Sequence, residues 1–227
     1  GFIRHYLLRQ KWSPEAIASK MREKGMPNAI CARTIYTYVD NGWISGVTNE
    51  SLWEKRLRGK RHKGLYRRAK RSNAPGHGID DRPEEIDKRE ELGHWEIDLV
   101  VGGTGKGKAA LMTLSERVSR KVMIRKLSNK TQRAVIRAIN GIERTMGSEE
   151  FKSIFKSITA DNGSEFLDFE SLERSVYGKK RRTHIYYAHP YSSWERGSNE
   201  NANRIIRRFI PKGCDISKFT RKQIKRI

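Results

Sequence analysis

Residues 93–102 carry the sequence GHWEIDLVVG, in which apolar and polar side chains alternate over most of the stretch. Such alternation is typical of a β-strand, because successive side chains point to opposite faces of a sheet. The pattern predicts one face with Trp95, Ile97, Leu99 and Val101 and another with Glu96, Asp98 and Val100. Aspartate is disfavoured inside strands, so Asp98 requires an explanation. It is either a residue on a solvated sheet face or a catalytic carboxylate.

The sequence after this strand predicts further strands and helices. Its periodicity predicts strands at 109–116 and 121–127, a helix at 131–146, a strand at 157–160, a helix from about 164, a strand at 184–187 and a helix from about 198. Three strands, a helix, a strand, a helix, a strand and a helix form an α/β layered order, which is also that of the ribonuclease H fold. We therefore predict for residues 92–227 a ribonuclease-H-like domain with a mixed five-stranded sheet and flanking helices.

A second candidate carboxylate, Asp161, follows directly after the predicted strand at 157–160. Ligand sites in open α/β sheets gather at the carboxyl ends of strands, which favours a functional role. Asp161 also opens the tripeptide Asp-Asn-Gly, which is a favourable turn in its own right. Position alone therefore leaves a functional carboxylate and a simple turn both open. The longer sequence DNGSEF at residues 161–166 is more specific than the turn alone.

The last predicted helix carries a third candidate carboxylate, Glu200. At about 100° per residue, one side of this helix is an apolar stripe suited to packing on the sheet, formed by Ala202, Ile205, Ile206 and Phe209. The other side would offer groups that a substrate could reach, or simply face solvent, namely Glu200, Asn203, Arg204 and Arg207. Glu195 competes with Glu200, but it precedes Gly197 and is expected in a loop with a less fixed position. We prefer Glu200.

Residues 1–50 have the pattern of a small helical region. Ser13 suits a helix N-cap and Pro14 the first helical position, and the helix is predicted to run to Gly25. A second helix is predicted at about 32–41. Two short helices joined by a turn are typical of a helix-turn-helix, whose second helix enters the DNA major groove. We predict such a region, with an ordinary helical hairpin as the alternative; its candidate DNA contacts are Thr34, Tyr36 and Thr37.

The chain is strongly basic, because 48 Lys and Arg against 26 Asp and Glu give a formal net charge of +22. Such a charge attracts polyanions, so nucleic acid is the leading partner. No apolar stretch approaches the length of a membrane-spanning helix, and two cysteines cannot build a structural zinc site. Ten of the seventeen residues at 55–71 are Lys or Arg. We predict a basic linker at 51–91 that is simply solvated, or also an arm that contacts DNA phosphates through Lys60, Arg61, Lys63, Arg67 and Arg68.

The combined motifs resemble transposases of the insertion sequence 30 family. The matching segments are 93–98, 161–163, 189–201 and 209–213, with 12–15, 34–36 and 82–85 upstream. The resemblance covers nearly the whole chain, and the motifs together are specific. It implies a ribonuclease-H-like catalytic domain in which Asp98, Asp161 and Glu200 are the catalytic triad and the metal ligands. The family's third carboxylate lies in an Asn-Glu-Asn element, which matches Glu200 and not Glu195.

The resemblance also implies a reaction and partners. Carboxylates suit hard divalent cations, Mg²⁺ first and Mn²⁺ as a substitute, and no small-molecule cofactor is expected. Two such ions would support hydrolysis at the end of a mobile element and attack of the freed 3′-hydroxyl on target DNA. The expected partners are double-stranded DNA, both element ends and target, and further copies of the chain in a homodimer or larger assembly. We expect no membrane partner and a location in the bacterial cytoplasm, with the nucleoid.

Further expectations concern single residues and the ends of the chain. Arg207 stands two helical turns after Glu200, where related integrases carry a basic residue, and Arg196 and Asn203 are further candidate DNA contacts. The basic segment 176–182 lengthens the interval before Glu200, and we interpret it as a loop insertion. The chain begins without Met and ends in an unfinished helical pattern, so we expect a fragment with a truncated C-terminus. The alternative functions are a transposase-derived DNA-binding protein without catalysis and a ribonuclease-H-like nuclease.

Overall fold

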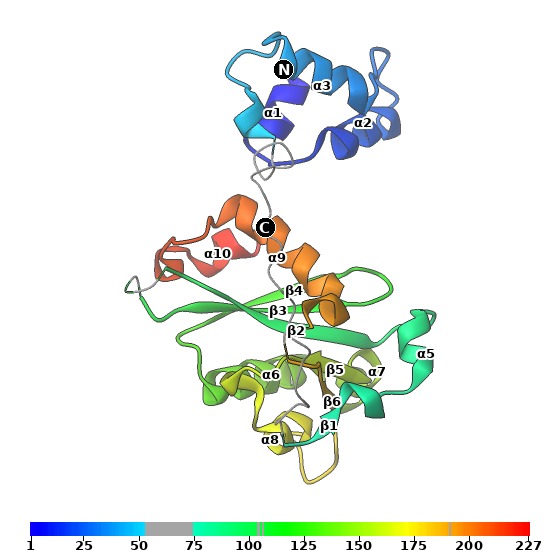
Figure 1. Ribbon diagram of the computed structural model, residues 1–227, viewed down its shortest axis with the longest axis vertical. Coiled ribbons are helices and arrows are strands. Elements are labelled where there is room, and N and C mark those ends of the chain that lie inside the picture. Colours follow the sequence, from blue (N-terminus) through cyan, green and yellow to red (C-terminus); the bar gives the residue numbers. More distant parts are fainter. Residues whose placement is uncertain (53–74, 104, 106, 191) are drawn as a thin grey trace. The chain divides into compact units, whose positions relative to one another are not determined.

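The computed structural model describes residues 1–52, 75–103, 105, 107–190 and 192–227. The chain divides into two compact units, Gly1–Tyr66 and Arg67–Ile227, each with a hydrophobic core (Figure 1). The candidate phosphate contacts at residues 60–68 lie outside the described residues. They stay a prediction, as does the predicted division of the chain into 1–50, 51–91 and 92–227.

Three α-helices form the described part of the first unit, with a short 3-10 turn: α1 (Phe2–Leu8), α2 (Pro14–Glu23), α3 (Ala32–Asp40) and η1 (Asn49–Ser51). Ser13 caps α2, since its Oγ accepts a hydrogen bond from Ala16 N at 3.3 Å. A buried cluster holds the helices together, formed by Leu7, Ile17, Ala18, Met21, Ile35, Val39, Val47 and Leu52. Both predicted helices are present, and α1 adds a third. That they form a DNA-binding helix-turn-helix stays a prediction.

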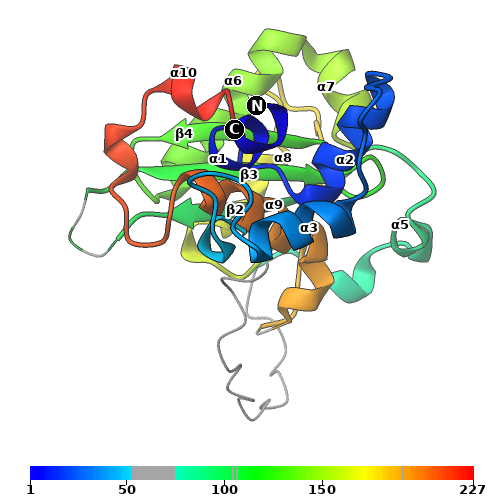
Figure 2. The ribbon, with the colours of Figure 1, turned by 90° about the horizontal axis from the view of Figure 1, so that it is seen from above.

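A six-stranded mixed sheet forms the centre of the second unit, in the order β1-β6-β5-β2-β3-β4. Its strands are β1 (His77–Gly78), β2 (His94–Val101), β3 (Ala110–Glu116), β4 (Val122–Leu127), β5 (Ser157–Ala160) and β6 (His184–Tyr187). Figure 2 shows β4, β3 and β2 side by side, and they pair antiparallel. Strand β5 pairs in parallel with β2 and β6, as β1 does with β6. The five predicted strands are present, and two-residue β1 is too short to show periodicity.

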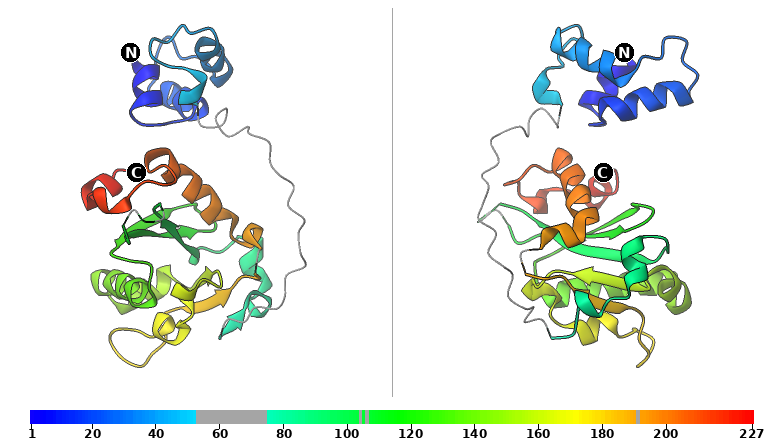
Figure 3. Two further views of the ribbon diagram at one scale, coloured as in Figure 1. Left: turned by 60° about the vertical axis from the view of Figure 1, so that its left-hand side comes forward. Right: turned by 45° about the vertical axis from the view of Figure 1, so that its right-hand side comes forward.

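Helices cover both faces of this sheet (Figure 3). One face packs against α6 (Gln132–Met146), α7 (Ser148–Ile154) and α8 (Phe169–Glu173), the other against α9 (Gly197–Phe209) and α10 (Arg221–Ile224). The remaining short elements are α5 (Glu84–Lys88), η2 (Ile79–Asp81), η3 (Ser164–Phe166), η4 (Ser193–Arg196) and η5 (Ile216–Lys218). The predicted α/β layers are confirmed. Among the described residues, no helix is long and apolar enough to cross a membrane.

Three local differences from the sequence-based predictions have physical reasons. The helix predicted from residue 164 is split into η3 and α8, because Asp168 caps α8 by accepting a hydrogen bond from Ser171 N at 3.1 Å. Helix α9 covers the polar face of β2, so Val100 is 2% exposed whereas Val101 is 40% exposed. Ile205, predicted in the apolar stripe of α9, is 39% exposed, which narrows the buried stripe of that helix.

Candidate active site

Asp98 lies within β2 with its side chain partly accessible, on the sheet face that α9 covers. Its Oδ1 accepts a hydrogen bond from Leu99 N at 2.8 Å, and its Oδ2 accepts one from Asn203 Nδ2 at 2.7 Å. Burial raises the pKa of the Asp98 carboxyl, and the nearby charge of Asp161 raises it further against the opposing charge of Arg196. The Asp98 carboxylate is therefore fixed in orientation by hydrogen bonds and is not freely solvated.

Asp161 follows the last residue of β5, beside Asp98. In the parallel pairing of β5 with β2, Thr159 lies opposite Glu96. Because neighbouring parallel strands keep the same register, the residue two positions after Thr159 falls next to the residue two positions after Glu96. This pairing places Asp161 close to Asp98, as expected for two carboxylates of one site.

The turn at 161–163 fixes the direction of the Asp161 carboxylate. Gly163 N donates to Asp161 Oδ1 at 2.9 Å, and Asn162 Nδ2 donates to Ala188 O at 2.7 Å just after β6. A Cβ atom on Gly163 would lie 2.8 Å from Asp161 Oδ1 and 2.9 Å from the Glu165 carboxyl carbon. A side chain at position 163 would therefore push the ends of the Asp161 and Glu165 side chains aside, although the φ of Gly163 is an ordinary −62°.

Arg196, at the start of α9, bridges the two aspartates. Its Nη2 lies 3.3 Å from Asp161 Oδ2 and its Nη1 lies 3.9 Å from Asp98 Oδ1. Its side chain is 13% exposed, and Nη1 also approaches Ile97 O at 3.5 Å. The sequence predicted Arg196 as a DNA contact, whereas here the guanidinium lies between the two carboxylates. Asp98 and Asp161 thus share one positive group.

Glu200 lies on the side of α9 that faces this pair. Residues 200, 203 and 207 recur at helical spacing and therefore lie along one side of the helix, and Arg196 is its N-cap residue. Three of them contact β2 or its carboxylate: Arg196 and Asn203 as above, and Arg207, whose Nη2 donates to Val101 O at 2.8 Å. The Glu200 side chain stands between them, is exposed, and makes no hydrogen bond or ion pair to the described part of the chain. Within the described residues, no three His, Cys, Asp or Glu side chains are placed to hold a metal ion together.

The competing Glu195 faces a different partner. It lies in η4, where its Oε2 accepts a hydrogen bond from His189 N at 2.8 Å and its Oε1 lies 2.9 Å from His189 Nδ1. The other ring nitrogen of His189 lies 3.1 Å from Asp80 Oδ2. The hydrogen bond to Glu195 raises the pKa of His189, with a further contribution from Asp80 and against burial. Both Glu195 oxygens are engaged at His189, which favours Glu200 as the third carboxylate.

The candidate DNA contacts of α3 have their own local partners. The Tyr36 hydroxyl donates to Glu15 Oε1 at 3.0 Å, and Thr34 Oγ1 lies 3.3 Å from Cys31 Sγ. Both side chains are half-buried, whereas Thr37 is exposed. Tyr36 therefore joins α3 to α2, and the direct DNA contacts proposed for these residues stay a prediction.

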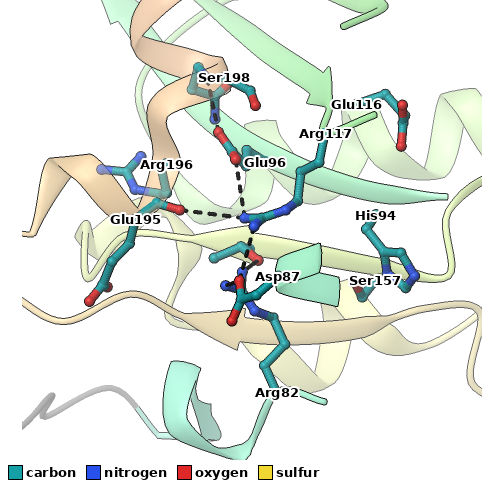
Figure 4. A network of polar contacts seen from close by, with 12 residues as sticks. Arg82, Asp87, His94, Glu96, Glu116, Arg117, Ser157, Glu195, Arg196 and Ser198 are labelled. Carbon is teal, nitrogen blue, oxygen red and sulfur yellow. Dashed lines mark hydrogen bonds and ion pairs between the residues drawn. The ribbon is translucent and has the colours of Figure 1, made fainter. Parts of the chain in front are cut away.

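A polar network that was not predicted from the sequence lies next to Asp98, with Glu96 and Arg117 buried in it (Figure 4). Glu96 is fully buried and lies 3.2 Å from Arg117, which pairs with Asp87 at 3.0 Å. Arg82 also pairs with Asp87. The signal was present in the sequence, because a glutamate inside a strand is disfavoured for the reason that singled out Asp98.

Comparison with known proteins places this arrangement in a class. Residues 88–191, which span β2 to β6 with Asp98 and Asp161, match the family described as Integrase core domain. The catalytic core domain of BIV integrase is similar at 17% identity and a TM-score of 0.37, over 50% of this chain and 66% of that chain. Because that score is low, the fold assignment depends on the family match and the strand order. Residues 88–191 are thus similar to an integrase core domain, and the predicted mixed α/β sheet with flanking helices, consistent with a ribonuclease-H-like fold, is confirmed.

Similar proteins in bacteria are transposases of insertion elements. The transposase for insertion sequence element IS4351 of Bacteroides fragilis is 38% identical over 96% of this chain. Transposase InsI for element IS30C of Escherichia coli K12 is 32% identical over 96%, and the probable transposase for element IS1161 of Streptococcus salivarius is 35% identical over 82%. The chain spans 63%, 56% and 49% of the lengths of these three proteins. The predicted resemblance to insertion sequence 30 transposases is confirmed.

Proposed function

We propose that this protein is a transposase that cuts and joins double-stranded DNA, with Asp98, Asp161 and Glu200 as its catalytic carboxylates. The pairing of Asp98 and Asp161 around one positive group, the Arg196 guanidinium, carries this proposal. The integrase core domain and the similarity to insertion-element transposases support it. The position of Glu200 on the side of α9 that faces Asp98 supports the choice of the third carboxylate.

The donor set fits a divalent cation. Carboxylate oxygens are the ligands that Mg²⁺ and Mn²⁺ prefer, and Asp98 and Asp161 already hold a cationic group between them. Glu200 is the nearest further acid along α9. When bound, such ions would supply Lewis acidity for hydrolysis of a phosphodiester and for attack by a 3′-hydroxyl. Mg²⁺ is the expected cofactor and Mn²⁺ its substitute.

The residues around the carboxylates orient them toward a common point. Asn203 holds Asp98 Oδ2, and Gly163 N holds Asp161 Oδ1. Asp161 Oδ2 and Asp98 Oδ1, which also accepts from Leu99 N, both face Arg196. If these carboxylates held a cation, the Arg196 guanidinium would move away from them and could contact a DNA phosphate, since a planar guanidinium suits that partner.

The partners follow from charge and from the reaction. A net charge of +22 favours a polyanion, and an arm at 55–71 with ten basic residues would contact DNA phosphates. Joining two element ends to a target requires at least two copies of the site, so we propose that a homodimer or larger assembly forms on DNA.

The proposal is tested by cleavage of a duplex that carries the terminal repeat of the protein's own element. D98N and D161N should each lower cleavage in Mg²⁺ about 100-fold or more while DNA binding is retained. D168N is the matched control, because asparagine caps a helix as well as aspartate does and α8 should be kept. Retained cleavage in D98N or D161N would contradict the assignment. Cleavage of an RNA–DNA hybrid in place of the duplex would favour a ribonuclease-H-like nuclease.

A further inference from the structure

Glu96 joins β2 to the first turn of α9. Its side chain is fully buried, and its Oε2 accepts a hydrogen bond from Asn199 N at 2.9 Å (Figure 4). The first N–H groups of a helix have no acceptor within the helix, and the positive end of the helix dipole favours a carboxylate. The residue at the N-cap, Arg196, makes no side-chain capping bond. Glu96 therefore caps α9 from a neighbouring strand.

The charge of Glu96 is balanced by a chain of ion pairs that runs from the buried pair Glu96–Arg117 to the exposed Asp87. Arg117 Nη1 lies 3.2 Å from Glu96 Oε1, and Arg117 Nη2 lies 3.0 Å from Asp87 Oδ1. Arg82 also binds Asp87 and donates to Thr159 Oγ1 on β5 at 3.0 Å. Buried ion pairs of this kind add little to stability compared with well-packed apolar residues, but they fix the positions of the groups that they join. The chain connects α5, β5, β2 and α9.

Other contacts hold the same turn of α9. Arg120 Nη1 donates to Ser198 Oγ at 3.1 Å, and Ser198 and Asn199 are buried. Glu200 follows Asn199 directly, and each helical residue turns by about 100° relative to the one before it. Fixing Asn199 N on Glu96 therefore fixes the direction of the next side chain, on the helix side where Asn203 meets Asp98.

We propose that Glu96 is a positioning residue of the active site. Its carboxylate fixes the first turn of α9 on β2 and so sets the direction of Glu200 relative to Asp98. The inference rests on the proposed function, because it gives a reason for the placement of the third catalytic carboxylate. A purely structural role would predict that loss of Glu96 acts only through global stability.

Two neutral double variants separate positioning from stability. E96Q/R117Q removes both charges and keeps an oxygen that can accept from Asn199 N. E96L/R117M removes both charges and that acceptor while keeping apolar volume, a change that buried ion pairs often tolerate. E143Q is the control, because Glu143 and Arg182 form another fully buried ion pair in this unit, away from α9. Hydrogen exchange of α9, cleavage kinetics and melting temperature are measured for all three and for the wild type.

In E96L/R117M, the amide hydrogens of residues 197–203 should exchange at least about tenfold faster than in the wild type, as expected for loss of a charged hydrogen bond. The kcat of this double variant should fall by a similar factor while KM for DNA is unchanged, and E96Q/R117Q should recover most of both losses. E143Q should lower the melting temperature without changing the exchange rates of residues 197–203 or kcat. Wild-type exchange and kcat in E96L/R117M, or an equal effect of E143Q on α9, would overturn the inference. If the wild type cleaves no DNA and the exchange pattern holds, the proposed function fails while the anchoring of α9 stands.

Discussion

Arg196 gives the candidate site its own positive charge. Its guanidinium lies within 3.3 Å of Asp161 and 3.9 Å of Asp98, so the two carboxylates do not face each other uncompensated. If Asp98 and Asp161 held a cation, the Arg196 side chain would have to move away from them. The displaced Arg196 would then be able to contact DNA. Its position between the carboxylates in this structure is therefore compatible with the phosphate contact expected from the sequence.

Removing Arg196 should therefore favour cation binding in the absence of DNA. R196Q is expected to bind Mn²⁺ about tenfold more tightly at pH 8, because loss of a charge-assisted contact frees the carboxylates. Isothermal titration measures this affinity. R204Q is the control, since Arg204 is an exposed arginine of the same helix and the variant loses the same charge. Equal or weaker Mn²⁺ binding in R196Q than in R204Q would contradict the role of Arg196 as a stand-in cation.

The His189–Glu195 pair should make stability depend on pH. The hydrogen bond to Glu195 raises the pKa of His189, so the folded protein holds the proton more tightly than the unfolded chain. The stabilisation is fully present below the unfolded His pKa of about 6.5 and is lost as pH rises through the folded pKa. E195Q should therefore lower the melting temperature more at pH 6 than at pH 9. E150Q, at an exposed glutamate of α7, should show no such difference; a pH-independent effect of E195Q would refute the pairing.

The sequence was informative about single residues where a residue type conflicts with its element. Asp98 in a strand was singled out on that ground, and Asp161 by its position at a strand end. Glu96 satisfies the same criterion, but its partner Asn199 lies 103 positions away, and no local pattern predicts that contact. The position of Arg196 was also missed, because a basic residue in a strongly basic chain has an ordinary explanation.

At the scale of elements, the turn after β5 and helix α6 offer a matched pair of glycine substitutions. G163A should lower cleavage, because the added Cβ would lie 2.8 Å from Asp161 Oδ1 and would push the end of the Asp161 side chain aside. G141A should raise the free energy of unfolding by about 0.5–1 kcal/mol, because alanine is the better helix former. A Cβ at Gly141 meets nothing within 4 Å. Chemical denaturation and cleavage assays measure both, and normal cleavage by G163A would argue against a fixed Asp161.

The elements with the clearest periodicity were the best predicted. Strand β2 alternates apolar and polar residues over most of its eight residues, and α6 has a long amphipathic pattern with a capping Thr131. Short elements depend on partners that a local pattern does not contain, as with β1, which exists only through its pairing with β6. The helical wheel of α9 identified its apolar and polar faces but not how much of the apolar face the sheet buries. Ile205 was therefore wrongly predicted to be buried.

At the scale of the whole molecule, the net charge of +22 predicts DNA binding with a steep salt dependence. Replacing five basic residues of the proposed arm by glutamine should reduce the slope of log K against log salt by about 4 to 5, at about 0.9 per phosphate contact. The residues are Lys60, Arg61, Lys63, Arg67 and Arg68. D98N should keep the wild-type slope. An unchanged slope in the five-residue variant would restrict residues 55–71 to the role of a solvated linker.

We propose that Asp98, Asp161 and Glu200 bind the catalytic cations. Locating Mn²⁺ by anomalous scattering in crystals of the protein with a DNA end tests this assignment directly. We expect anomalous peaks ligated by Asp98 and Asp161 together with Glu200, with the Arg196 guanidinium moved out of the space between the aspartates. Mn²⁺ held by Glu195 in place of Glu200 would contradict the assignment of the third carboxylate. No ion at Asp98 and Asp161, with DNA bound, would contradict the proposed catalytic site and favour a DNA-binding protein without catalysis.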